Sequence, residues 1–250
     1  MKIFRLFGLL TLLSFIGCKN TSSSEQLKAI IANYEEPREY DYETNESVEN
    51  TIKFYQAESD FAKKVKQELN LISTEGLSET DQISKELLEF VLQDKIDRHT
   101  FKMYLNPITN ERAFHLNLSR KANKKLKNEQ DVKDYFAALE KLPARIDYNL
   151  NLLREGVKLG ISQPREVFGD YGFSYDKHII SDATMSEFYT PFLQLPASLS
   201  TAKKDSILKA ASVSIHQNVI DQYKKIKTYF ETDYFPNTRK GLGVTTVPDG

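Results

Sequence analysis

Hydrophobic residues in this chain recur mostly at steps of three and four, which is the spacing of one face of an α-helix. The pattern predicts a short helix at 25–34 and two longer helices, one over 48–72 and one over 83–96. Ser78 and Asp81 precede the second of these in a capping-box-like arrangement, which favours a helix start there. We expect the two longer helices to pack as a hairpin.

Further apolar stripes predict helices at 132–142 and 146–157 and a short one at 185–192. The last helix is expected to be the longest, because its apolar face extends from about 200 to 234 without an internal proline or glycine. Over 99–118 the pattern changes to alternation, which predicts a short β-hairpin or an extended arm. The sequence therefore predicts an all-α fold, mainly helical, arranged as a helical array with a long C-terminal helix.

Composition limits the class of protein. The chain has 250 residues, of which 40% are hydrophobic and 28% charged, so it contains enough apolar material for a core. Its formal net charge of -1 gives no general attraction to nucleic acid, and we expect no nucleic-acid partner. One basic run has no interleaved aromatic residues, so we interpret it as a solvated loop; it comprises Arg120, Lys121, Lys124, Lys125 and Lys127.

The amino terminus has the features of an export signal. Lys2 and Arg5 precede an apolar run that is too short to span a bilayer as a helix, and Gly17 and Cys18 follow it. A cysteine in this position resembles the lipobox of bacterial lipoproteins, in which the thiol is lipidated. The alternative is an ordinary secretory signal with an accidental cysteine.

Lipidation at Cys18 divides the chain into three parts: a signal peptide at 1–17, the lipidated cysteine with a polar tether at 18–24, and a helical domain at 25–250. The membrane is then the first expected partner, reached through the N-terminal lipid, and the location is the bacterial cell envelope. Lys19 gives no reason for retention at the inner membrane, so we favour the outer membrane.

No reaction centre is evident in the sequence. The four histidines, His99, His115, His178 and His216, do not form a His-Glu-x-x-His zinc motif, and there is neither a Gly-x-Ser-x-Gly nucleophile elbow nor a Walker-type phosphate loop. We therefore name no catalytic, cofactor-binding or metal-binding residue. A link rich in tyrosine and acid is either the lining of a sugar or peptide site or, as we favour, a solvated connector; its tyrosines are Tyr34, Tyr40 and Tyr42.

Two stretches carry a family resemblance. The first runs from Leu142-Pro143-Ala144-Arg145-Ile146-Asp147 to Gly160, and the second from Tyr234 to Leu242, with Pro248-Asp249-Gly250 after it. In order and spacing they resemble the bacterial family called domain of unknown function 885, whose members are often lipoproteins. The resemblance implies a largely helical fold similar to zinc metallopeptidases. It places a His-Glu motif and its histidine partner in the later half of chains about twice as long.

This chain contains no His-Glu motif, so the resemblance transfers no metal ligand or general base to any of its residues. Zinc is implied for the full-length family only, as is a peptide substrate, and whether this chain is an enzyme is left open. We expect it to be the non-catalytic, amino-terminal part of a membrane-anchored, peptidase-like lipoprotein. The alternative is a stand-alone helical lipoprotein that binds a peptide, a glycan or an envelope partner without catalysis.

Overall fold

The computed structural model describes residues 21–34, 47–109, 111–116 and 118–248. Within these ranges the chain forms α-helices, shorter 3-10 and π-helical segments and connecting turns, with no strand. The α-helices are α1 (Ser23–Tyr34), α2 (Val48–Asn70), α3 (Glu79–Thr100), α4 (Glu129–Glu140), α5 (Leu142–Lys158), α6 (Thr201–Ile215) and α7 (Asp221–Tyr229). The predicted all-α fold is thus confirmed for the described residues.

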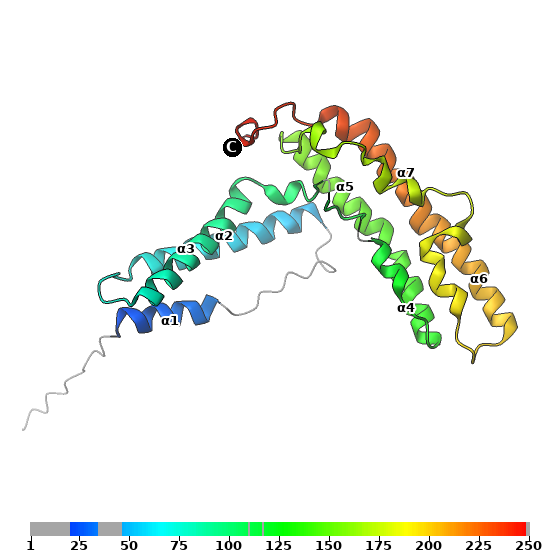
Figure 1. The fold of residues 1–250 in the computed structure, drawn as a ribbon, viewed down its shortest axis with the longest axis horizontal. Helices are drawn as coiled ribbons and strands as arrows, with labels where there is room; N and C mark the ends of the chain where they lie inside the picture. The colour runs from blue at the N-terminus through cyan, green and yellow to red at the C-terminus, as the bar shows by residue number, and fades with distance from the viewer. Residues whose placement is uncertain (1–20, 35–46, 110, 117, 249–250) are drawn as a thin grey trace, which may run out of the picture.

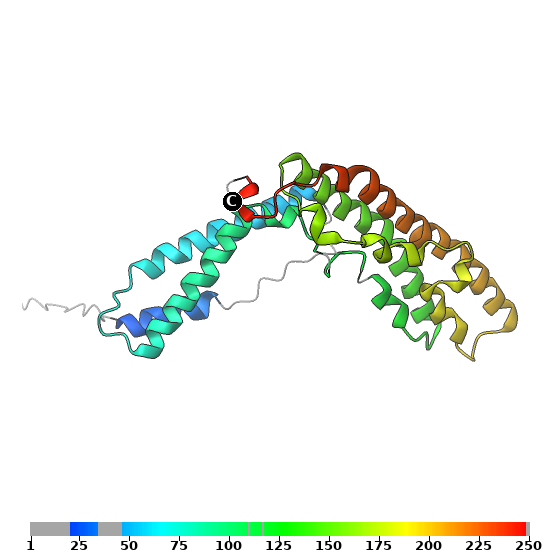
Figure 2. The same ribbon diagram turned by 45° about the horizontal axis from the view of Figure 1, so that its top comes forward.

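The helices form two groups that meet at an angle, so that the molecule has the outline of an arch (Figures 1 and 2). Helices α1 to α3 make one side, and α4 to α7 make the other. The upper ends of α2 and α3 approach α5 at the apex of the arch. None of the described helices is both long enough and apolar enough to cross a bilayer.

The α1–α3 group is the predicted hairpin with a third helix packed on it. Ser47 and Ser78 begin α2 and α3, and each side-chain oxygen accepts a hydrogen bond from a backbone N–H of the first turn. The turn between the helices contains Gly76, whose φ of 85° is favourable only for glycine. The small core of this group consists of Leu27, Ala62, Val65, Leu69, Ile72, Leu77, Leu88 and Leu92.

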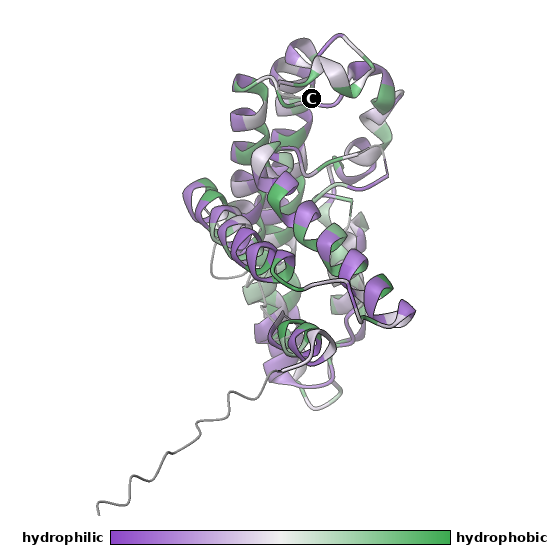
Figure 3. Cartoon of the chain, turned by 90° about the vertical axis from the view of Figure 1, so that its left-hand side faces the viewer, coloured by the Kyte–Doolittle hydropathy of each residue, from purple (hydrophilic) through white to green (hydrophobic). Residues whose placement is uncertain are grey.

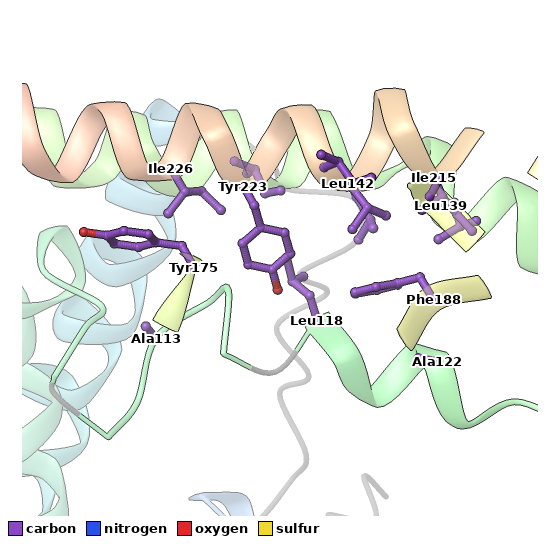
Figure 4. Close-up of a cluster of buried hydrophobic side chains, with 14 of the residues drawn as sticks. Ala113, Leu118, Ala122, Leu139, Leu142, Tyr175, Phe188, Ile215, Tyr223 and Ile226 are labelled. Carbon is purple, nitrogen blue, oxygen red and sulfur yellow. The ribbon is translucent and has the colours of Figure 1, made fainter. Parts of the chain in front are cut away.

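The α4–α7 group holds the larger core, in which side chains from several segments point into one space (Figure 4). Leu139 and Leu142 come from α4 and α5, and Ile215 and Tyr223 from α6 and α7; Phe188 covers them from the 3-10 helix Glu187–Gln194. Tyr223 also donates a hydrogen bond of 2.9 Å from its hydroxyl to the His115 carbonyl, which ties the 111–116 segment to this core.

The long C-terminal helix is confirmed, with a difference in its detail. Two π-helical segments, His216–Ile220 and Phe230–Tyr234, interrupt the α-helical hydrogen bonding between Thr201 and Tyr234. A π-turn adds a residue to one turn and rotates the positions that follow it. Here Val219, Ile220, Phe230 and Tyr234 are all buried, so both π-helical segments contribute side chains to the core.

The alternation at 99–118 gives no strand among its described residues. Helix α3 continues to Thr100, Lys102 takes a left-handed φ of 49°, and a 3-10 turn at Met103–Leu105 follows. Tyr104 and Leu105 are both buried although they are adjacent, which a two-faced strand would not produce. The β-hairpin alternative is therefore wrong for these residues, and the segment is an irregular arm packed on α5. The short helix predicted at 185–192 is a 3-10 helix instead, and it contains Pro191.

At Gly156 the close packing of α5 against neighbouring backbone opposes the higher helix propensity of alanine. It lies in α5, where alanine would ordinarily be more favourable by about 1 kcal/mol. A Cβ at this position would lie 2.7 Å from the carbonyl oxygens of both Leu105 and Ile161. We therefore expect Gly156→Ala to lower the free energy of unfolding by about 1–3 kcal/mol in urea denaturation. Gly243→Ala is the control, because its Cβ would meet only Thr245 Oγ1, at 3.4 Å; equal stability of the two variants would contradict the packing argument.

Candidate functional site

A pocket of about 300 Å³ opens at the apex of the arch, where α2 meets α5 and the irregular arm. Its lining includes three tyrosines, two arginines and one asparagine. These residues are Tyr55, Tyr104, Tyr148, Arg112, Arg145 and Asn149. We call this the apex pocket.

Aromatic contacts fix the walls of the apex pocket. Tyr55, from α2, stacks on Tyr104 of the arm with 4.5 Å between ring centroids and 13° between ring planes. Tyr148, from α5, lies with its hydroxyl 2.6 Å from the Thr51 hydroxyl of α2. Burial raises the pKa of Tyr104, so that side chain is neutral at physiological pH. The two helix groups therefore meet through tyrosines whose positions are set by both sides.

Two arginines supply the charge of the apex pocket. Arg145 projects from α5, one turn before Asn149, and the Asn149 side-chain amide donates to the Arg145 carbonyl at 2.8 Å. Arg112 is held by a backbone contact: its carbonyl oxygen accepts a hydrogen bond of 2.6 Å from the backbone N–H of Thr109. Both arginine side chains are exposed, and no described carboxylate forms an ion pair with either guanidinium. The pocket is therefore cationic in the region that the structure describes.

A planar guanidinium presents N–H donors in the geometry of a carboxylate or phosphate, and tyrosine rings offer flat faces for stacking. The apex pocket combines both kinds of group in a cavity at the lower limit of small-molecule sites. Its chemistry fits binding of an anion that carries a flat or apolar part.

A second hollow, of about 410 Å³, lies between the end of α3 and the C-terminal segment. Arg239 lines it but is already engaged, since its guanidinium donates to the carbonyls of Ser162, Gly241 and Gly243 and to the Thr246 hydroxyl. Through its Nε and Nη1 donors this arginine holds the C-terminal segment in place.

Two of the histidines, His115 and His178, lie near each other, and both contact Tyr223. His115 is fully buried, and its Nε2 lies 3.0 Å from the Ser174 hydroxyl, while its Nδ1 has no hydrogen-bond partner in the described part of the chain. His178 stacks on Tyr223 with 4.1 Å between ring centroids. Burial lowers the pKa of His115 to about 3 and that of His178 to about 4; the neighbouring His178 adds to the first shift, and Lys177 adds to the second. His216 lies on the surface with its Nδ1 3.3 Å from Asp221.

The buried His115–Ser174 pair lacks the third, carboxylate member of a nucleophile triad among its described contacts. The described residues also include no group of three or more His, Cys, Asp and Glu side chains placed to hold a metal ion.

The remaining predictions from the sequence fall in several places. Cys18 and the predicted signal peptide at 1–17 lie outside the described residues, as do Tyr40 and Tyr42. Tyr34 ends α1 and stacks on Phe61 at 6.3 Å, so it contributes to packing. From the basic run, Lys124, Lys125 and Lys127 are exposed, as a solvated loop requires.

The sequence analysis did not identify the apex pocket. Its residues are dispersed from Tyr55 to Leu152, and no spacing rule connects a helix near the start with one in the middle of the chain. The available signal was Arg145, a charged residue within the stretch that resembles the family and directly before the helix predicted at 146–157.

Both stretches of family resemblance have structural explanations. Pro143 stands in the first turn of α5, and Ile146 and Leu150 pack into the main core. In the second stretch the Tyr234 hydroxyl donates to Asn106 at 2.8 Å and accepts from the Gln163 backbone N–H at 3.2 Å.

Comparison with known proteins gives one positive result. No curated protein and no solved structure matches the chain. Residues 41–250, however, match the family described as bacterial protein of unknown function (DUF885). Because this match covers most of the chain, the protein belongs to the DUF885 family of bacterial proteins of unknown function.

Proposed function

We propose that this chain binds an anionic, peptide-like ligand at the apex pocket and is the non-catalytic part of a membrane-anchored lipoprotein. The observation that carries the proposal is the pair Arg112 and Arg145, which have no described acidic partner and flank a cavity walled by tyrosines. A free carboxylate on the ligand would supply the missing negative charge.

The peptide character of the ligand rests on the resemblance to zinc metallopeptidases. A peptide carries a terminal carboxylate that fits between two guanidinium groups, and its side chains can stack on tyrosine rings. In this proposal the apex pocket holds one end of the peptide. The zinc and its His-Glu motif are those of the full-length family and are assigned to no residue of this chain.

Attachment to the membrane completes the proposal. Cys18 would carry the lipid after removal of residues 1–17, and the polar tether would connect it to α1. Several acyl chains together hold a protein on a bilayer more firmly than one does. The location that follows is the bacterial cell envelope, with the outer membrane favoured.

The second candidate is a lipoprotein that captures a glycan or an envelope partner without any peptide substrate. The stacked Tyr55 and Tyr104 favour it, because aromatic faces also pack against sugar rings. The two candidates differ in whether binding requires the positive charge of the arginines. Binding of a neutral oligosaccharide would not depend on them, whereas binding of a peptide carboxylate would.

A binding experiment on the full chain tests the proposal. We expect dye-labelled peptides with a free C-terminal carboxylate to bind more tightly than the same peptides with an amidated end, measured by fluorescence anisotropy. Since a hydrogen bond to a charged group contributes about 1.5–3 kcal/mol, R145Q and R112Q are each expected to weaken binding about tenfold or more. Arg98→Gln is the matched control, because Arg98 pairs with Asp94 on the surface of α3, away from the pocket.

Equal affinity of free and amidated peptides would contradict the anion site. Binding of neutral oligosaccharides that survives both substitutions would favour the glycan alternative. Peptide hydrolysis by the purified chain, with zinc bound in a stoichiometric amount, would contradict the non-catalytic part of the proposal.

A further inference from the structure

Helix α3 exposes an apolar stripe on its outer side. Ile83, Leu87, Phe90 and Val91 follow one another at helical spacing, with side chains 52%, 61%, 74% and 40% exposed. We call these four residues the α3 stripe. Figure 3 views the α1–α3 group from its free end and shows hydrophobic positions among the hydrophilic ones on these helices.

The opposite side of the same helix is already used for packing. Leu88 and Leu92 are buried in the core that α3 shares with α1 and α2. Helix α3 is therefore apolar on two sides, and the described residues cover only one of them. A helix with this pattern normally has a partner on each apolar side, and a contiguous exposed apolar patch marks an interaction surface.

The start of α1 lies against the start of α3. Helices α1 and α3 are in contact, and Ser24 in the first turn of α1 lies close enough to the Asp81 carboxylate to lower its pKa. Asp81 stands two residues before the α3 stripe begins at Ile83. Cys18 is six residues before Ser24, and six residues span at most about 20 Å even when fully extended. A lipid on Cys18 would therefore hold the beginning of α3 close to the bilayer, whatever path the intervening residues take.

We infer that the α3 stripe inserts into the interfacial region of the bilayer to which Cys18 is anchored. The inference rests on the lipidation that is part of the proposed function. It adds a second, protein-borne contact to the lipid anchor, and it lays the α1–α3 group along the membrane surface.

The charges beside the stripe indicate which kind of lipid surface it suits. Glu86 is exposed between Ile83 and Leu87 in sequence, and Glu79 begins the helix. Arg98, further along, is paired with Asp94. Attraction to anionic headgroups is therefore not the driving force. Insertion depends on burial of apolar area, and it is expected to be insensitive to salt and to require no anionic lipid.

Site-specific fluorescence on the lipidated full chain, reconstituted into phosphatidylethanolamine–phosphatidylcholine vesicles, tests the inference. The thiol of Cys18 is blocked by its lipid, so Phe90→Cys offers the single reactive thiol for a polarity-sensitive dye. Val213→Cys is the matched control, since Val213 is an apolar residue on α6 with 56% of its side chain exposed. We expect a blue shift at position 90 and at least twofold quenching by nitroxide-labelled lipids, in low and high salt alike. Position 213 should show neither effect.

Three results would overturn the inference. If the protein floats with the vesicles but position 90 behaves like position 213, the anchor stands and the α3 stripe does not touch lipid. If the dye at position 90 shifts to the blue with protein concentration but is not quenched by nitroxide lipids, a second copy of the chain covers the stripe. If the protein does not float with the vesicles at all, lipidation of Cys18 itself fails.

Discussion

Phe230→Ala is expected to lower the free energy of unfolding by about 3–5 kcal/mol. Phe230 is fully buried and lies where the long C-terminal helix crosses the aromatic part of the core. Its ring centroid is 5.6 Å from that of His115, 5.2 Å from that of Tyr171 and 5.4 Å from that of Phe235. Truncation removes these contacts together and leaves a cavity that rigid neighbouring rings cannot fill.

Urea denaturation followed by circular dichroism measures this loss. Phe173→Ala is the control, because Phe173 also has a ring contact with Tyr171, at 6.2 Å, but its side chain is 58% exposed. We expect the control to change stability by less than about 1 kcal/mol. A similar loss of unfolding free energy in both variants would contradict the argument that burial of Phe230 in the core is what stabilises the fold.

Acidification from pH 7 to pH 5 is expected to destabilise the fold through His115 and His178. In the folded chain burial lowers the pKa of His115 to about 3 and that of His178 to about 4, from 6.5 in an exposed imidazole. Lys177 lowers the pKa of His178 further, and Glu187 opposes this in part. Both imidazoles are therefore neutral in the folded chain throughout this pH range.

The direction in which stability changes with pH follows from proton linkage. Below pH 6.5 the unfolded chain takes up protons on these imidazoles while the folded chain does not, so stability falls as the pH falls. The loss continues until the pH reaches the folded pKa values, near 4 for His178 and near 3 for His115. At pH 5 it amounts to about 2 kcal/mol for each histidine.

Unfolding midpoints in urea at pH 7, 6 and 5 measure the slope, in a range above that in which most carboxylates titrate. His115→Gln is expected to be less stable at pH 7 and to have a shallower decline towards pH 5. His216→Gln replaces a surface histidine and is expected to keep the original slope. A decline that is unchanged in His115→Gln would show that this imidazole is not the source.

The fold was predictable from the sequence to the extent that it is helical. The stripes at 48–72 and 83–96 correspond to α2 and α3, and the face from 200 to 234 corresponds to the long C-terminal helix. These predictions succeeded because an amphipathic helix must turn its apolar face to a core, so its period is visible without knowledge of the partner. The alternation at 99–118 wrongly indicated a β-hairpin. Tyr104 and Leu105 are buried there because they pack against α5, which lies far along the chain.

The apex pocket was not predictable in the same way. Tyr55 and Tyr148 are 93 residues apart, and either one alone is an ordinary half-buried tyrosine on an amphipathic helix. They become walls of one cavity only because α2 and α5 meet at the apex of the arch. The same is true of Arg112 and Arg145, whose significance lies in their common pocket and in the absence of a described acidic partner.

The sequence by itself determined the helical class, the hairpin of α2 and α3, the length of the C-terminal helix and the family to which the chain belongs, because periodicity and motif order are local properties. Only the tertiary structure decided that Gly156 must lack a side chain, that His115 and His178 are buried and neutral, and that the arginines share a tyrosine-walled pocket. Each of these depends on which distant segments come into contact, and the hydrophobic burial that brings them together is non-directional, so it leaves no fixed spacing in the sequence.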